Sequence, residues 1–270
     1  MDNKIIVITG STRGIGFGLA DSFLALGCAV VISGRQPQAV EQAIAKLSSQ
    51  YGTERILGYP CDVANFNQVQ SLWDAAKSHF GRVDIWINNA GISHPRVNFW
   101  EQSPDLLETI IQTNILGVMY GSKVALAGML VQGSGAVYNM EGLGSDGRLF
   151  PKMGIYGSTK AGLHYFNRAL VKEVEGTPVL VGMIRPGMVL TDMLLGEHAR
   201  SSPDWEANQH IFSILAERVD VVTPFLARKI LANHKNGGLI SYLTGSRVFM
   251  RFLTMPFKCE TRMNKNKRKI

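Results

Sequence analysis

Short apolar runs alternate with longer helical patterns along almost the whole chain, and this alternation limits the fold more than any other feature. The runs are continuous and rich in Val and Ile, as strands buried on both faces of a parallel sheet are. The strand candidates are Ile5–Thr9, Ala29–Ser33, Arg55–Tyr59, Val83–Asn88, Ala136–Asn139, Val179–Ile184 and Leu239–Leu243. Helical patterns lie near Gly16–Leu26, Gln38–Gln50, Phe66–Phe80, Asp105–Leu130 and Tyr156–Glu175. This order predicts an α/β fold, a single Rossmann-like doubly wound parallel sheet with helices on both faces.

The chain shows no internal repeat and no low-complexity linker within its 270 residues. We therefore expect one domain over residues 1–246 and a basic, apolar tail over residues 247–270. Cys28, Cys61 and Cys259 are odd in number and lack metal-site spacing, which predicts reduced thiols and no metal. The first strand candidate begins near the N-terminus, which leaves no room for a signal peptide. No apolar run reaches the ~18 residues of a membrane-spanning helix. We expect a cytoplasmic protein.

Three glycines, Gly10, Gly14 and Gly16, lie between the first strand candidate and the first helical pattern. Glycines at such a place let the backbone turn tightly and leave the N–H groups of the helix N-terminus open to a phosphate. A glycine pattern alone is weak evidence, because many tight turns look like it. Its position directly after the first strand favours a dinucleotide site.

Tyr156 and Lys160 are four residues apart, which places them on one face of a predicted helix. A neighbouring ammonium lowers the pKa of a phenol, so the pair suits proton delivery to a carbonyl oxygen. Such pairs are common by chance, and the order of the surrounding motifs gives this one its weight.

The glycine loop reads T-G-x-x-x-G-x-G, and at this point the chain resembles the short-chain dehydrogenase/reductase family. Further motifs of that family follow in the same order, so that the resemblance covers residues 4 to about 245. They are Asp62-Val63, Asn88-Asn89-Ala90-Gly91, Asn114, Tyr156-Gly157-Ser158-Thr159-Lys160, and Arg185-Pro186-Gly187 followed by Thr191. The resemblance implies an oxidoreductase that forms a homodimer or homotetramer through its long helices.

The resemblance also implies catalytic roles. Tyr156 would donate the proton, and Lys160 would lower the pKa of Tyr156 and hold the nicotinamide ribose. Asn114 would support a water relay to Lys160.

Other matching residues would bind the cofactor. Asp62 would contact the adenine, Thr191 the carboxamide, and Asn88 the ribose region and the central strand. A helix cap is the plain alternative for Asp62 and Thr191. The expected cofactor positions are Gly10, Ser11, Arg13, Gly14, Ile15, Gly16, Arg35, Asp62, Val63, Asn89, Ala90, Gly91, Tyr156, Lys160, Pro186, Gly187, Val189 and Thr191.

The choice of cofactor follows from charge. An NAD site needs a carboxylate at the end of the second strand for the ribose 2′-hydroxyl, but residues 28 to 40 contain no Asp or Glu. Arg35 stands there instead, and Arg13 of the glycine loop can approach the same point. Two guanidiniums suit a 2′-phosphate, so we predict NADPH. The plain alternative is that Arg35 is a solvated surface charge.

One family position is not matched. The family usually carries a serine 13 residues before the tyrosine, and this chain has Leu143 there. Glu141 and Gly142 replace the serines of the usual Asn-x-Ser-Ser. Ser145 is the nearest hydroxyl, and a glycine-rich loop could carry it into the site as a catalytic residue. Two other interpretations stay open: Tyr156 acts without a serine, or the protein binds the dinucleotide and catalyses nothing.

This departure points to a subgroup. Residues 139–147, together with 156–160, 186–195 and 242–244, resemble the chlorophyll(ide) b reductases, which reduce the 7-formyl group of the pigment to hydroxymethyl with NADPH. The resemblance implies an NADPH-dependent carbonyl reductase for a bulky, apolar substrate. The alternatives are a general carbonyl reductase or alcohol dehydrogenase, and a non-catalytic dinucleotide-binding regulatory protein.

Two segments lie outside these motifs. Met188–Arg218 follows the sixth strand, and we interpret it as a substrate lid, with a surface helix pair as the alternative. Arg247–Ile270 has eight basic residues and one acid, whereas the rest of the chain has 20 of each and is neutral. We therefore expect no specific nucleic-acid partner. The tail either packs on the fold with a disordered end, anchors the protein to an anionic membrane, or binds nucleic acid weakly.

Overall fold

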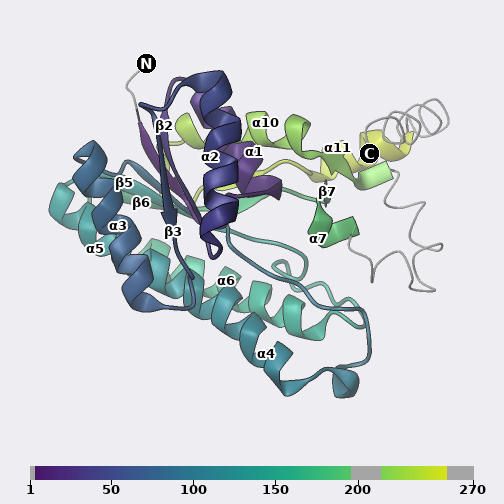
Figure 1. The fold of residues 1–270 in the computed structure, drawn as a ribbon. Helices are drawn as coiled ribbons and strands as arrows, with labels where there is room; N and C mark the ends of the chain where they lie inside the picture. The colour runs from purple at the N-terminus through teal and green to yellow at the C-terminus, as the bar shows by residue number, and fades with distance from the viewer. Residues whose placement is uncertain (1–3, 196–213, 254–270) are drawn as a thin grey trace.

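A parallel sheet of seven strands lies between two layers of helices (Figure 1). The structure is a computed structural model that describes residues 4–195 and 214–253. The strand order is β3-β2-β1-β4-β5-β6-β9, and every neighbouring pair is parallel. The strands are β1 Ile5–Ile8, β2 Ala29–Gly34, β3 Ile56–Pro60, β4 Ile85–Asn88, β5 Gly135–Met140, β6 Val179–Arg185 and β9 Leu239–Ser241. The predicted doubly wound sheet is confirmed, and its order reverses between β1 and β4, where such sheets bind ligands.

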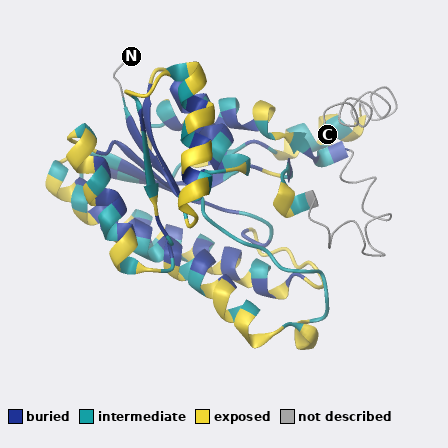
Figure 2. Ribbon diagram, viewed as in Figure 1, coloured by how far each residue is buried: buried dark blue, intermediate teal, exposed yellow. Residues whose placement is uncertain are grey.

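Both faces of the sheet are buried, because successive side chains of a strand point to opposite sides. Ile6 and Ile8 face one helix layer and Val7 faces the other, all fully buried. The first layer holds α1 (Gly14–Ala25), α2 (Pro37–Tyr51) and α10 (Val219–Leu231), and the second holds α3 (Phe66–Phe80), α5 (Gly117–Gln132) and α6 (Gly154–Glu173). Figure 2 shows the buried strands between helices whose outer surfaces are exposed.

The helix predicted over Asp105–Leu130 is one continuous stretch with an irregular centre. It consists of α4 (Pro104–Ile111), the π-helical turn η2 (Gln112–Leu116) and α5. By length and composition this stretch could cross a membrane, which the count of uninterrupted apolar residues did not show. In the structure α5 contributes buried residues such as Val124, Ala125 and Met129 to the core beside the sheet. A core helix of a soluble protein passes the same test.

Helix α10 was not predicted. Pro224 lies inside it, and proline normally ends a helix pattern because it lacks an N–H group. The helix packs closely on α1, where Ser22 Oγ lies 3.1 Å from Thr223 Oγ1. A Cβ at Gly18 would stand 2.4 Å from Val219, so the absence of a side chain at Gly18 permits this contact.

The remaining elements lie near the carboxyl ends of the strands. Within the expected lid, the structure describes β7 (Val189–Leu190), α7 (Asp192–Leu195) and β8 (Glu217–Arg218), and β7 pairs with β8. Residues 196–213, the centre of that segment, lie outside the described residues. Further along, α11 (Gly245–Leu253) spans the boundary that we expected between residues 246 and 247. A short 3-10 helix, η1 (Phe99–Glu101), precedes α4.

Candidate active site

The glycine loop joins β1 to α1 and approaches the loop after β4. Gly10 and Gly14 have φ angles of +62° and +59°, which favour glycine. A Cβ at Gly10 would stand 2.8 Å from the Cα of Ala90, and one at Gly16 would stand 2.5 Å from the Gly10 carbonyl oxygen. Arg13 is the N-cap of α1 and makes no side-chain cap hydrogen bond. The first N–H groups of α1 therefore suit the pyrophosphate of a dinucleotide.

The residues after β4 hold this loop in place. Asn89 Nδ2 donates to the carbonyl oxygens of Thr9 and Gly10, each at 3.0 Å. The N–H groups of Asn89 and Ala90 donate to Thr9 Oγ1 at 3.0 and 3.1 Å. The side chain of Asn89 thus shapes the loop.

Two exposed arginines stand at one edge of the loop. A Cβ at Gly34 would lie 2.7 Å from Thr12, so the end of β2 contacts the glycine loop. Arg13 and Arg35 directly follow these two residues, and both are exposed. Ser11 is buried, and its Oγ accepts from Ser33 N–H at 2.9 Å, which fixes the same contact. The contact between Gly34 and Thr12 brings the positions of Arg13 and Arg35 near one another.

The positions after β3 and β6 lie at the carboxyl ends of their strands, like the residues after β1 and β4. The Asp62 carboxylate accepts from Ala64 N–H at 3.0 Å in a local turn, and Val63 is buried against Gly117. After β6, Pro186 and Val189 are buried and Gly187 has φ +79°. Thr191 reaches the glycine loop, because a Cβ at Gly14 would lie 3.6 Å from its methyl group, and Ile15 packs against the core beneath.

Asn88 has a structural role in this fold. It is 1% exposed, and its amide bonds to Asn139 of β5 at 2.7 Å and to Ser122 of α5 at 3.1 Å. Trp86 Nε1 donates to Asn88 Oδ1 at 2.8 Å. Asn88 therefore supports the central strand, as expected. Both ends of its side-chain amide are engaged by other residues of the protein.

The predicted catalytic pair, Tyr156 and Lys160, lies on α6. Lys160 is 4% exposed, and its Nζ donates to the Met140 carbonyl oxygen at the end of β5, at 3.0 Å. The same Nζ lies 5.7 Å from the ring centroid of Tyr156. Since β5 pairs with β4, Lys160 is tied to the sheet edge where the loop after β4 begins.

The pKa values of the pair move in opposite directions. Burial raises the pKa of Tyr156 to about 12, rather than lowering it as the sequence led us to expect. Burial lowers the pKa of Lys160 to about 8, against the opposing effect of the Glu141 carboxylate. In this state Tyr156 is a phenol at neutral pH, which is the form that donates a proton.

Asn114 connects the loop after β4 to α6 from the centre of the π-helical turn. It is fully buried; its Oδ1 accepts from Ile92 N–H, and its Nδ2 donates to the Ile92 carbonyl oxygen, both at 2.9 Å. Nδ2 also donates to Thr159 Oγ1 at 3.3 Å. Irregular helical turns of this type are frequent at functional sites.

Where the family has a serine after the fifth strand, this chain has the backbone of Gly142 close to the Tyr156 hydroxyl. A Cβ at Gly142 would stand 2.7 Å from the Tyr156 hydroxyl. Ser145 is 2% exposed, and its Oγ accepts from Gly142 N–H at 2.9 Å, so that it closes the turn after β5. The Ser145 hydroxyl is therefore bonded to Gly142, the residue that lies against the Tyr156 hydroxyl. In that bond Ser145 Oγ is the acceptor, so its own proton can be donated elsewhere.

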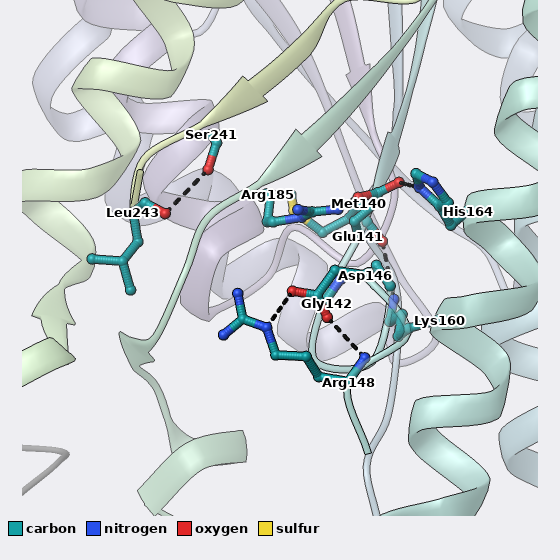
Figure 3. A network of polar contacts seen from close by, with 11 residues as sticks. Met140, Glu141, Gly142, Asp146, Arg148, Lys160, His164, Arg185, Ser241 and Leu243 are labelled. Carbon is teal, nitrogen blue, oxygen red and sulfur yellow. Dashed lines mark hydrogen bonds and ion pairs between the residues drawn. The ribbon is translucent and has the colours of Figure 1, made fainter. Parts of the chain in front are cut away.

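Sequence reasoning missed an ion cluster beside this pair. Glu141, whose side chain is 0% exposed, accepts from Arg185 Nε and Nη2 at 3.1 and 2.6 Å. Its other oxygen lies 2.7 Å from His164 Nδ1. Figure 3 shows Glu141 between Arg185 and His164, with Met140 and Lys160 beside them. The available signals were an acid in place of a serine after β5 and a histidine four residues after Lys160.

Three comparisons relate the chain to known proteins. The sequence profile of the short chain dehydrogenases matches residues 4–201. A chlorophyll(ide) b reductase of Oryza sativa subsp. japonica is 35% identical over 258 residues, which cover 92% of this chain and 74% of that protein. A probable chlorophyll(ide) b reductase of the same plant is 36% identical over 92% of this chain, and the chain spans 51% of its length.

Among solved structures, L-sorbose reductase from Gluconobacter frateurii, complexed with NADPH and L-sorbose, superposes with a TM-score of 0.76. It is 25% identical, and the match covers 88% of this chain and 94% of that chain.

Proposed function

Because this chain belongs to the short-chain dehydrogenase family, we propose that it is an NADPH-dependent carbonyl reductase for a bulky, apolar aldehyde or ketone. The family makes it an oxidoreductase for CH–OH or carbonyl groups that uses a nicotinamide dinucleotide. One observation carries the proposal: the Tyr156 hydroxyl and Lys160 meet at the carboxyl ends of β4 and β5, beside a glycine loop that fits a pyrophosphate. The first candidate substrate is chlorophyllide b, whose 7-formyl group would become hydroxymethyl, since the similarity to chlorophyll(ide) b reductases extends over 92% of the chain.

In the proposed reaction, Tyr156, Lys160 and Asn114 have separate roles. A bound NADPH supplies the hydride. Tyr156 gives its proton to the carbonyl oxygen, and its raised pKa keeps that proton in place until negative charge develops on the oxygen. The Lys160 ammonium then stabilises the tyrosinate, and the Met140 carbonyl holds it in position. Asn114 keeps the loop after β4 at a fixed distance from α6.

The decisive experiment is an anaerobic incubation with NADPH and chlorophyllide b, beside a panel of simple aldehydes and ketones, with product analysis. Tyr156→Phe is the control, and its turnover should fall by about 10²–10⁴-fold while it still binds NADPH, because only the acid is lost. Formation of the hydroxymethyl product supports the full proposal. If only simple carbonyls are reduced, the pigment is not the substrate and the general reductase remains. If NADPH binds and no carbonyl is reduced, the non-catalytic alternative holds.

A second proposal concerns the C-terminal helix: we propose that α11 docks the protein on an anionic membrane. Its two arginines face the protein. Arg247 lies over the rings of Phe225 and Tyr242, at 4.4 and 4.5 Å, and Arg251 pairs with Glu217 at 2.6 Å. Its outward positions are apolar, with Phe249, Phe252 and Leu253 exposed by 64, 47 and 56%.

Charge argues for lipid as the partner of that face. The sequence after Leu253 has six basic residues and one acid, directly following the exposed apolar side chains along the chain. An apolar face followed by basic residues matches the interface of an anionic bilayer. Sedimentation with anionic vesicles tests this proposal.

The long helices support a third expectation, a homodimer or homotetramer. Ile111, Leu116 and Tyr165 are exposed by 48, 36 and 78% on the α4–α5 stretch and on α6. A second copy of the chain could cover these side chains.

A further inference from the structure

The charge of Glu141 lies beside the catalytic lysine. Met140, the residue before Glu141, holds Lys160 Nζ by its carbonyl oxygen. His164, which holds the Glu141 carboxylate, is one helical turn from Lys160 on α6. The Glu141 carboxylate and the Lys160 ammonium are therefore both held at the carboxyl end of β5 and by the same face of α6.

A buried carboxylate persists as an anion only when it is paired and hydrogen-bonded. Arg185, from the end of β6, donates two hydrogen bonds to one oxygen, and His164 binds the other. The Arg185 and His164 side chains are 26 and 36% exposed, so the cluster links the buried carboxylate to solvent. The family serine that Glu141 replaces could not supply this charge.

We propose that Glu141 is a positioning residue for the Tyr156–Lys160 pair, and that its buried carboxylate keeps Lys160 in the ammonium form that the pair requires. Lys160 is itself buried, and burial favours the neutral amine. The Glu141 charge opposes this effect by raising the pKa of Lys160. Glu141 does not touch the reacting atoms, because both of its oxygens are engaged by Arg185 and His164.

The charged and titratable groups around Lys160 come from four elements. Tyr156 and His164 share α6 with it, Glu141 directly follows β5, and Arg185 ends β6. His94, on the loop after β4, accepts from the Tyr156 N–H group at 3.3 Å. Glu141 is the charge of this set that acts on Lys160, and Arg185 and His164 hold its carboxylate.

The test measures the titration of Lys160 directly. Full-length protein is labelled with ¹³C at the lysine ε-carbon, and the Lys160 signal is assigned by its loss in Lys160→Arg. In Glu141→Gln the Lys160 midpoint should fall by about one pH unit, because the carboxylate that favours the ammonium form is lost. In Arg185→Gln it should also fall, because the buried carboxylate loses the two hydrogen bonds that keep it ionised. Glu173→Gln, which removes an exposed carboxylate from the end of the same helix, should leave it unchanged.

A lower Lys160 midpoint in both single variants, with Glu173→Gln unchanged, establishes the inference. The same Lys160 midpoint in wild type, Glu141→Gln and Arg185→Gln, with folding checked by circular dichroism, overturns it and leaves the cluster a purely structural role. If Glu141→Gln does not fold, Arg185→Gln alone decides, since its Lys160 midpoint must fall.

A second readout rests on the proposed function. The kcat/KM for carbonyl reduction should decline at lower pH in Glu141→Gln than in wild type. The two proposals can fail separately. If the enzyme reduces a carbonyl but the Lys160 midpoint does not shift in the variants, only the role of Glu141 is refuted. If the midpoint shifts but no carbonyl is reduced, only the reductase proposal is refuted.

Discussion

Gly142 brings the main chain directly against the hydroxyl that would react. The loop that begins there contains two further glycines in the left-handed region, Gly144 at φ +93° and Gly147 at φ +81°. Ser145 closes its first turn. The sequence left open whether Ser145 replaces the family serine, and the geometry is compatible with a polar contact made by its proton. The site therefore depends on the absence of a side chain at Gly142 as much as on the side chains that are present.

Gly142→Ala should lower kcat by about 10-fold to 100-fold. The added Cβ would stand 2.7 Å from the Tyr156 hydroxyl and must displace it, and a displacement of that kind is costly for a proton donor. Steady-state kinetics with the best carbonyl substrate give the measurement. Gly154→Ala is the matched control, since an added Cβ there meets nothing within 4 Å. Equal rates for both variants would show that Tyr156 reacts from another position.

Arg35→Asp should shift the cofactor preference from NADPH toward NADH. The carboxylate would repel a 2′-phosphate and accept a hydrogen bond from the 2′-hydroxyl. The ratio of kcat/KM for the two cofactors, taken first in wild type, gives the measurement. A wild-type preference for NADH would contradict the assignment of Arg13 and Arg35 to the phosphate.

Among the elements, α11 reverses the usual arrangement of an amphipathic surface helix. Its charged side chains face the protein, and its apolar side chains face outward. Arg251 also donates to the Leu215 carbonyl oxygen at 2.7 Å, so it ties α11 to the residues just before β8. The sequence analysis counted both arginines in the excess charge of the basic tail, whereas in the structure they contact the folded domain.

Arg251→Ala should destabilise the protein by about 1–3 kcal/mol, because it leaves Glu217 and the Leu215 carbonyl without this donor. Denaturant unfolding gives the measurement. Arg148→Ala, which breaks a pair on an arginine that is 77% exposed, is the control and should change the free energy of unfolding by under about 1 kcal/mol. Similar losses for both would mean that α11 contributes little to the folded state.

Phe249→Ser combined with Phe252→Ser should abolish vesicle binding and leave stability nearly unchanged, since both rings are exposed. Wild-type protein should sediment with anionic vesicles at low salt and be released at high salt, because each basic residue near the surface contributes about 1 kcal/mol that salt screens. Phe99→Ser, which alters a ring that is 65% exposed on η1, should still bind. Wild-type protein that stays in the supernatant at low salt would refute membrane docking.

The whole molecule buries its sheet on both faces, yet exposes apolar side chains on the α4–α5 stretch and α6. The same α6 carries Tyr156 and Lys160 on its inner side. An assembly through these helices would therefore support the helix that holds the catalytic pair.

Sedimentation should show wild-type protein as a dimer or tetramer, and Tyr165→Asp should shift it toward the monomer by placing a charge in the covered face. Val221→Asp is the control, because Val221 is 44% exposed on α10, in the other helix layer. A monomeric wild type at micromolar concentration would exclude this assembly.

Features that are local in the chain followed from the sequence alone. Runs of Val and Ile predicted β1 to β6 and β9 to within a few residues, since burial on both faces demands continuous apolar strands. The glycine spacing and the Tyr156–Lys160 pair identified the family, because tight turns and helix periodicity are written in consecutive residues. The predicted cofactor, catalytic and substrate assignments still await the experiments above.

Features that depend on distant residues required the tertiary structure. Glu141, His164 and Arg185 come from three elements, and nothing in their spacing predicts that one carboxylate joins them. The pKa of Tyr156 rises because burial disfavours the charged phenolate, and burial depends on packing. The inward orientation of Arg247 and Arg251 likewise arises only where α11 meets Tyr242 and Glu217. Charge and burial are properties of the folded surroundings, so composition alone could not assign them.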